Sequence, residues 1–168
     1  MMKIVHLVCY IEPELGYQDY FLAKEHAKSG HEVIVVASDR HYPFPDYYST
    51  VYPILGNRMI GTGQWQCDGF KIIRLKTFFE IGSTKIWLRG LHTTILNLKP
   101  DVVICHGMTT FNALRIISLK KKLGFRLVYD DHTLFCVVKK GILGALYYRL
   151  FDFKRILRHA DTIIVFSD

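Results

Sequence analysis

Six short runs rich in Val and Ile constrain the fold of this chain more than any other feature of its sequence. Their apolar residues are nearly continuous rather than alternating, which is typical of strands that are covered on both faces. The runs are "KIVHLVC" (3–9), "EVIVVAS" (32–38), "FKIIRL" (70–75), "DVVICH" (101–106), "RLVYDD" (126–131) and "DTIIVFS" (161–167). Sheets of such strands are parallel and lie between layers of helices.

Segments with the apolar spacing of helices lie between most of these runs. They cover residues 20–27, 87–98 and 111–119, and the stop signals Gly30, Pro100 and Gly124 follow them. The alternation predicts an α/β fold with a doubly wound, mainly parallel sheet of six or seven strands, flanked by helices and joined by right-handed crossovers.

The interval 39–67 breaks this rhythm because prolines and glycines punctuate a tyrosine-rich segment. We interpret it as a long loop on the ligand side of the sheet. Within it, "GTGQWQ" (61–66) does not follow a strand and open a helix, so we interpret it as a turn and not as a nucleotide-binding loop.

Composition and charge narrow the class of protein. The chain has 168 residues, of which half are apolar and 22% are charged, and this predicts a single globular domain. Neither a secretory signal nor a run of about twenty apolar residues is visible, so we expect a cytoplasmic protein. The four cysteines form no C-x-x-C pair, and we expect reduced thiols, no metal and no cofactor.

The net charge of +7 indicates an anionic partner: nucleic acid, a phosphorylated substrate or an acidic membrane surface.

Polar residues gather where the strand-like runs end. In a doubly wound sheet, ligands bind outside the carboxyl ends of the strands, near the point where the strand order reverses. The residues predicted at this edge are Tyr10, Glu12, Gly16, His106, Asp130, Asp131 and His132. The structural alternative for the last stretch is that Asp131 or Thr133 caps a following helix.

Five segments in register resemble a known family of enzymes. They are "LGYQDYFLAKEHAKSGHEVIVVAS" (15–38), "DGFKIIRL" (68–75), "LKPDVVICHG" (98–107), "RLVYDDHT" (126–133) and "HADTIIVFSD" (159–168). In order and spacing they resemble the amino-terminal domain of the retaining, GT-B-fold glycosyltransferases of family four, and "SGHEV" (29–33) is the most recognisable part.

The resemblance covers essentially the whole chain. It implies that residues 1–168 form the Rossmann-like, acceptor-side domain of a two-domain enzyme whose donor-binding domain is absent from this chain. The enzyme would move a sugar from a nucleotide-sugar donor to a glycan or lipid-linked acceptor in cell-envelope or surface-polysaccharide synthesis. The chain alone is then expected to be inactive, whether it is an excised domain or works with a separate donor-binding partner.

The resemblance also assigns candidate site residues. His132 matches the family's histidine that lies near the reacting sugar, so we expect it to be catalytic by donating a hydrogen bond at neutral pH. We expect the substrate to be bound by Gly16, Tyr17, His106, Asp130, Asp131 and Thr133. His106 has packing beneath the cleft as its alternative role.

Gly16 would let the backbone approach a phosphate at the start of a helix, where exposed N–H groups favour an anion. Many relatives have two adjacent glycines at this loop, whereas here Tyr17 takes the second position. This departure puts a close backbone contact at position 17 in doubt, although the phenol could hydrogen-bond a ligand instead.

Residues 137–159 mix cationic side chains with Leu, Tyr and Phe at helical spacing. Such a basic amphipathic helix is typical of attachment to an anionic membrane surface, here the inner face, and its alternative is an ordinary crossover helix covering the sheet. The cationic residues are Lys139, Lys140, Arg149, Lys154, Arg155 and Arg158.

The sequence is also compatible with functions other than that of a glycosyltransferase. A noncatalytic membrane-docking subunit that recruits a donor-binding chain is the main alternative. A dinucleotide-dependent oxidoreductase is disfavoured because G-x-G-x-x-G does not follow the first strand. We expect no nucleic-acid partner, since no recognisable binding motif accompanies the charge.

Overall fold

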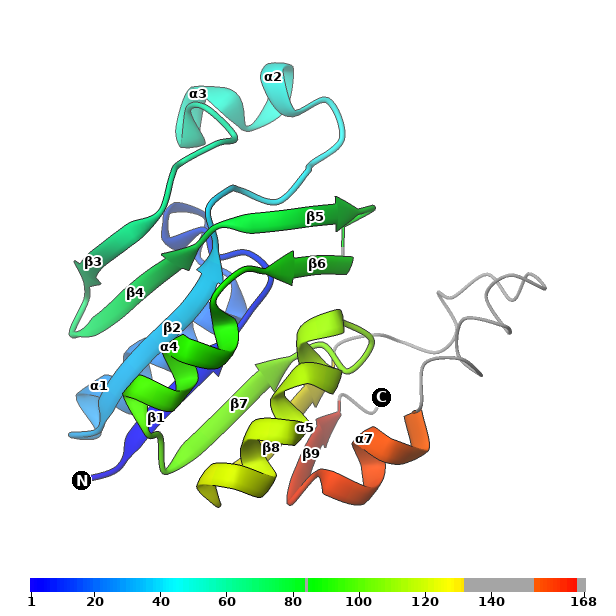
Figure 1. Cartoon of the computed structure of the whole chain (residues 1–168). Coiled ribbons are helices and arrows are strands. Elements are labelled where there is room, and N and C mark those ends of the chain that lie inside the picture. Colours follow the sequence, from blue (N-terminus) through cyan, green and yellow to red (C-terminus); the bar gives the residue numbers. More distant parts are fainter. Residues whose placement is uncertain (84, 132–152, 166–168) are drawn as a thin grey trace.

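The computed structural model describes residues 1–83, 85–131 and 153–165 of the chain. Its centre is a seven-stranded sheet in the order β3-β4-β2-β1-β7-β8-β9 (Figure 1). All neighbouring strands pair in parallel except β3, which pairs antiparallel with β4. The predicted mainly parallel α/β sheet is therefore confirmed. The strands are β1 (Lys3–Leu7), β2 (Glu32–Ser38), β3 (Gly63–Cys67), β4 (Phe70–Leu75), β7 (Val102–His106), β8 (Arg126–Asp131) and β9 (Thr162–Val165).

Helices cover both faces of this sheet. Figure 1 shows α4 (Leu91–Leu98) and α5 (Phe111–Leu123) in front of it and α1 (Gln18–Lys28) behind it. Alternate residues of each strand serve the two layers. In β1, Val5 and Leu7 belong to the cluster beneath α4 and α5, whereas Ile4 belongs to the cluster beneath α1. Burial on both faces explains why β1, β2, β4, β7 and β8 read as continuous apolar runs. The expectation is wrong for β9, an edge strand in which Ile164 and Val165 are exposed.

The last described helix, α7 (Phe153–His159), packs against α5 and contributes Ile156, which is fully buried, to the front cluster. The crossover role considered for this part of 137–159 is therefore present. Every helix in the described ranges is too short or too polar to cross a bilayer.

The predicted helix over 87–98 is wrong in its first part. Trp87 and Leu88 belong to β6 (Lys85–Leu88), which forms an antiparallel hairpin with β5 (Thr77–Ile81), and the helix begins only at Leu91. Leu88 and Leu91 are both fully buried in one cluster, so a strand and a helix together produced the apolar spacing of a single helix. Gly90 separates them in the left-handed conformation, with φ of 80°.

The turn proposed for residues 61–66 is also wrong. Residues 63–67 form the edge strand β3, whose polar, exposed side chains give no buried pattern. The rest of the interval 39–67 is less regular, as predicted, but it holds two single-turn helices, α2 (Tyr47–Thr50) and α3 (Tyr52–Leu55). A short 3-10 helix (Pro13–Leu15) precedes α1.

One carboxylate fixes the β5–β6 hairpin to the rest of the domain. Glu80 of β5 accepts hydrogen bonds from Arg40 (3.0 Å), from Arg58 and from the phenol of Tyr10. Burial alone would raise its pKa, but the hydrogen bonds from Arg58, Tyr10 and Arg40 hold the pKa of Glu80 below its ordinary value. The segment after β1, the segment after β2 and the hairpin therefore meet at one ionised group.

We expect Glu80→Gln to lower the free energy of unfolding by about 2 kcal/mol, because two partly buried guanidinium groups lose their counter-charge. The matched control is Glu25→Gln, which removes an exposed carboxylate paired with Lys28 at 2.5 Å and should cost less than about 0.5 kcal/mol. Urea unfolding of the two variants measures both values. Equal losses would show that the Glu80 cluster does not fix the hairpin.

Candidate functional site

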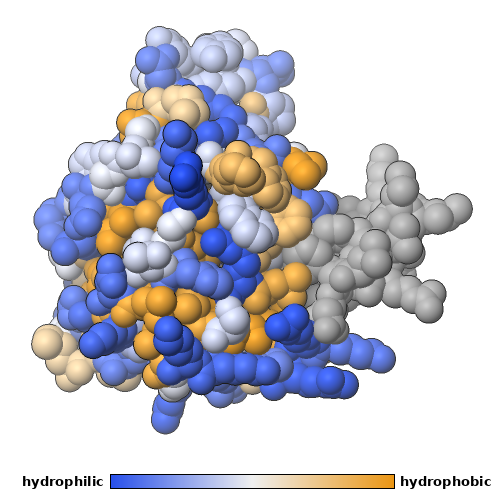
Figure 2. Space-filling model, in the orientation of Figure 1, coloured by the Kyte–Doolittle hydropathy of each residue, from blue (hydrophilic) through white to orange (hydrophobic). Residues whose placement is uncertain are grey.

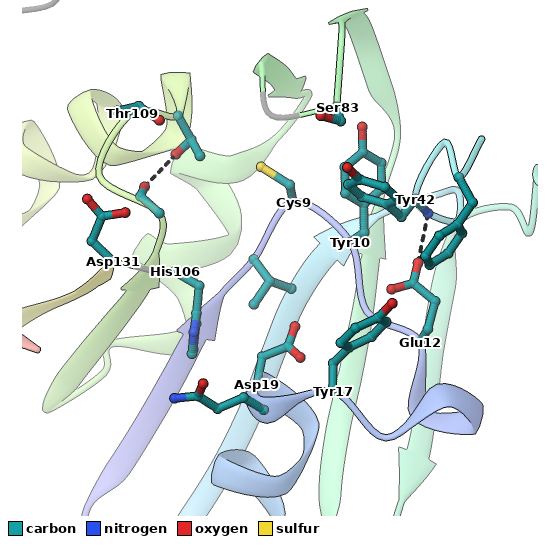
Figure 3. Close-up of a pocket in the computed structure, with 15 residues that line it drawn as sticks. Cys9, Tyr10, Glu12, Tyr17, Asp19, Tyr42, Ser83, His106, Thr109 and Asp131 are labelled. Carbon is teal, nitrogen blue, oxygen red and sulfur yellow. Dashed lines mark hydrogen bonds between the residues drawn. The ribbon is translucent and has the colours of Figure 1, made fainter. Parts of the chain in front are cut away.

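A cleft of about 590 Å³ opens at the carboxyl edge of the sheet. It lies where the strand order reverses: β1 leads to β2 and β4 on one side, and β7 leads to β8 and β9 on the other. This is the topological switch point at which doubly wound sheets bind ligands. Figure 3 shows its wall, which combines the end of β1, the start of α1, the loop after β2, the β5–β6 turn and the ends of β7 and β8.

Carboxylates mark three sides of the cleft: Glu12, Asp19 and Asp131. Glu12 is buried and fixed, since its Oε1 accepts the backbone N–H of Tyr42 at 2.8 Å and lies 3.6 Å from the His41 imidazole. Asp19 lies in the first turn of α1, where its Oδ1 accepts the N–H of Tyr20 at 3.0 Å. Burial raises the pKa of Asp19, and His106 opposes that shift.

Aromatic rings form the wall opposite His106, as Figure 3 shows. The rings of Tyr17 and Phe44 stack with an interplanar angle of 15° and centroids 6.4 Å apart. Tyr42 meets Phe44 edge to face at 4.8 Å and Tyr10 edge to face at 5.4 Å. This continuous wall offers ring faces and phenol hydroxyls to whatever occupies the cleft.

A chain of imidazoles runs beneath the cleft on the α1 face of the sheet. His26 Nδ1 lies 3.1 Å from His6 Nε2, and His6 Nδ1 lies 3.0 Å from His106 Nε2. His106 Nδ1 lies 2.9 Å from the carboxylate of Asp130, which is fully buried. The chain therefore joins α1, β1, β7 and β8 through side chains alone.

The positions of the ring hydrogens give the chain of imidazoles a direction of hydrogen bonding. Each contact between two ring nitrogens holds one hydrogen, because a neutral imidazole donates from one nitrogen and accepts at the other. When the hydrogen of His106 lies on Nδ1, on the side of the Asp130 carboxylate, His6 donates to His106 and His26 donates to His6. The tautomers of His6 and His106 are then fixed, as are the planes of their rings.

Burial of the middle imidazole excludes its charged form. His6 is fully buried, and desolvation, followed by the neighbouring His106 and His26, holds its pKa well below the ordinary 6.5. Burial, with His31 and His106, also lowers the pKa of His26. His6 and His26 are therefore neutral at physiological pH.

The structure brings together five of the residues predicted for this edge or for the site. They are Tyr10, Glu12, Tyr17, His106 and Asp131, and all five line the cleft. Asp130 lies under it, in contact with His106. Gly16 adjoins the lining residue Tyr17 in the left-handed conformation, with φ of 62°, and an added Cβ would lie 3.2 Å from the ring of Phe21.

These local constraints are sufficient to explain why a glycine occupies position 16. The structure therefore supplies no separate indication that the backbone there approaches a phosphate.

Several predicted residues lie outside the described ranges: His132, Thr133, Lys139, Lys140 and Arg149. Lys154, Arg155 and Arg158 are described, and all three are exposed on α7 rather than placed in the cleft.

Sequence reasoning missed Asp19, Tyr42 and Phe44 as lining residues, and it missed the imidazole chain. Asp19 could have been predicted from the sequence, since it lies three residues after Gly16 at a predicted helix start. His6 lies within the first predicted strand, but its partners come from segments 20 and 100 residues away in the sequence. No local pattern identifies such pairs.

Comparison with known proteins identifies the family. The sequence model described as Glycosyltransferase Family 4 matches residues 20–168. The chain belongs to glycosyltransferase family 4.

A solved structure also matches this glycosyltransferase domain. It is a protein of unknown function from Vibrio parahaemolyticus RIMD 2210633, with 15% sequence identity and a TM-score of 0.48, over 99% of this chain and 94% of that one. A search of curated proteins gave no significant match.

The buried imidazole chain predicts loss of stability in acid. Because the pKa of folded His6 lies below its unfolded value of 6.5, the unfolded domain takes up this proton first as the pH falls. The stabilisation from neutral His6 is thus complete above about pH 6.5 and is lost below it. For His6 alone, the free energy of unfolding falls by about 2 kcal/mol between about pH 7 and pH 5.

Urea unfolding across this pH range measures the effect. His6→Gln should flatten the acid slope, whereas His92→Gln, at an exposed position on α4, should leave it unchanged. An unchanged slope in His6→Gln would contradict the assignment of acid sensitivity to this chain.

Proposed function

We propose that this domain is the acceptor-side half of a family 4 glycosyltransferase and that the cleft holds the acceptor. A second Rossmann-like half binds the nucleotide-sugar donor and faces the cleft. The observation that carries the proposal is the placement of the cleft. It opens at the switch point between β1 and β7 in a chain of this family, and carboxylates and aromatic rings line it.

The lining fits the demands of sugar transfer. An acceptor hydroxyl attacks the anomeric carbon of the donor sugar, the bond to the nucleotide phosphate breaks, and the hydroxyl proton passes to the departing phosphate oxygen. Acceptor-side residues contribute by holding the hydroxyl in line, because orientation converts a bimolecular step into an effectively unimolecular one. Asp19 and Asp131 provide carboxylate oxygens that accept from hydroxyl groups.

The imidazole chain supports this positioning. His106 lines the cleft, and its two ring nitrogens contact His6 and Asp130, so the ring forms a fixed wall rather than a mobile acid or base. The general rule that productive geometry needs side chains held by further hydrogen bonds fits this arrangement.

The acceptor class and cellular site also belong to the proposal. We place the enzyme at the inner face of the cell membrane, acting on a glycan or lipid-linked acceptor in cell-envelope or surface-polysaccharide synthesis. Support comes from the exposed cationic face of α7, with Lys154, Arg155 and Arg158, because anionic lipid surfaces attract such clusters. This surface would equally serve a noncatalytic docking subunit, but the polar, pre-formed cleft favours the enzyme.

A turnover assay tests the proposal. The domain joined to its donor-binding half should release nucleotide from one member of a panel of nucleotide sugars in the presence of a membrane extract. Residues 1–168 alone should fold and show no turnover, because they lack the second half that the mechanism requires. Turnover by the isolated domain, or none by the complete protein with any donor, would contradict the proposal.

His132 allows a sharper test within the complete enzyme. If its imidazole donates to developing charge, His132→Ala should lower turnover by roughly 100- to 1,000-fold with little change in the thermal midpoint. If the segment after β8 is instead a helix cap, Asp131→Ala should cost about 1 kcal/mol of stability and His132→Ala should leave turnover near normal. Turnover and thermal midpoint, measured for both variants, separate the two outcomes.

A further inference from the structure

The charge of the cleft has the opposite sign to the charge of the chain. The net charge is +7, yet the charged side chains among the described residues that line the cleft are the carboxylates Glu12, Asp19 and Asp131, with neither Lys nor Arg. Arg40 and Arg58 are both held by Glu80, and the buried Arg74 donates to the backbone carbonyls of Ser38 and Ile11.

Exposed cations gather instead at the opposite edge of the sheet. Lys28 ends α1, Lys99 precedes β7, Lys121 and Lys122 end α5, and Arg126 begins β8. Figure 2 shows hydrophilic side chains along the lower edge of the molecule, where Figure 1 places the amino ends of these strands. The positive charge of the chain therefore does not describe the environment of the cleft.

The aromatic wall indicates what kind of molecule fits beside these carboxylates. The Tyr17 and Phe44 rings are within 15° of parallel, Tyr17 is 48% exposed, and both residues line the cleft. The negative face of an aromatic ring attracts the slightly positive C–H groups on one face of a sugar. Hydroxyl or ammonium groups at the rim of the same sugar would meet the carboxylates, which accept hydrogen bonds and repel anions.

We propose that the acceptor subsite of the cleft takes a sugar that is uncharged or carries an ammonium group, with Asp19 as the residue that selects against uronates and sugar phosphates. This inference rests on the proposed function, since it names the class of acceptor for the same cleft. Asp19 is suited to selection because one oxygen is held by the N–H of Tyr20, which fixes the direction of the carboxylate. Figure 3 shows this carboxylate turned into the cleft, on the side of His106.

A matched series of glycosides tests the proposal on the 168-residue chain. Methyl glucoside, its 6-amino-6-deoxy analogue and methyl glucuronide differ only at carbon 6, and the corresponding galactosides repeat the series in a second configuration. We expect the neutral and ammonium compounds to bind at least about tenfold more tightly than the uronate, because a like charge within a partly desolvated cleft is strongly unfavourable. Dissociation constants come from amide chemical-shift titrations.

Variants of Asp19 separate charge from shape. Asp19→Asn keeps an oxygen for the Tyr20 N–H and should reduce the tenfold preference to less than about threefold, while Asp19→Lys should reverse it. The matched control Glu25→Gln removes an exposed carboxylate from the same helix, away from the cleft, and should leave the preference unchanged. The amide spectrum of each variant establishes that it remains folded.

The outcomes distinguish a failure of the charge selection from a failure of the proposed acceptor cleft. Tight binding of the uronate by the unaltered chain, or an unchanged preference in a folded Asp19→Asn variant, overturns the charge selection and leaves the acceptor cleft standing. Failure of every glycoside in both configurations to shift the cleft residues overturns the acceptor cleft itself, and this inference with it.

Discussion

The parallel pairing of β1 with β2 on one side and with β7 on the other is the constraint on which the rest of the structure depends. Leu7 lies opposite Val36 in one neighbour and opposite Cys105 in the other, so the three strands end within two residues of one another. The chain after β1 continues to β2 on one side, and the chain after β7 continues to β8 on the other side. The cleft lies between these diverging connections, at the ends of β1 and β7. The position of the site follows from strand order before any particular side chain is considered.

Buried polar side chains lie between the sheet and α1. A fully buried histidine in a central strand would be costly without partners, because buried polar groups need hydrogen bonds. His6 meets this requirement through His26 and His106, and the latter reaches Asp130. Stability and site geometry are thus coupled: the contacts that make the buried histidine tolerable also hold the wall of the cleft in place.

Most of the fold could be predicted from the sequence because five of the six apolar runs form β1, β2, β4, β7 and β8, which are largely buried and read as uninterrupted apolar stretches. The sixth run forms the edge strand β9, which is largely exposed. The failures have physical causes. The β5–β6 hairpin leads through Gly90 into α4, and the combined burial of Leu88 and Leu91 imitates a helical stripe. The edge strand β3 is polar and exposed, so its pairing with β4 leaves no hydrophobic pattern.

The site was predictable in place but not in composition. The switch-point rule placed Tyr10, His106 and Asp131 at one edge, where all three line the cleft, because the rule depends only on strand direction. Tyr42, Phe44 and the partners of His6 were not accessible to the same reasoning, since they enter from loops or from distant strands. Net charge does not describe the cleft either, because it is a sum over the whole chain, whereas only a few charged side chains line the described part of the cleft.

The central claim is that the acceptor lies in the cleft at the carboxyl edge of the sheet, and the most direct measurement is the location of a bound sugar. A crystal structure of the domain with a neutral methyl glycoside provides it. The account predicts electron density between the Asp19 carboxylate and the ring of Tyr17, within reach of His106. Density for the sugar on the basic edge near Lys121 and Arg126, with the cleft left to solvent, would contradict the account.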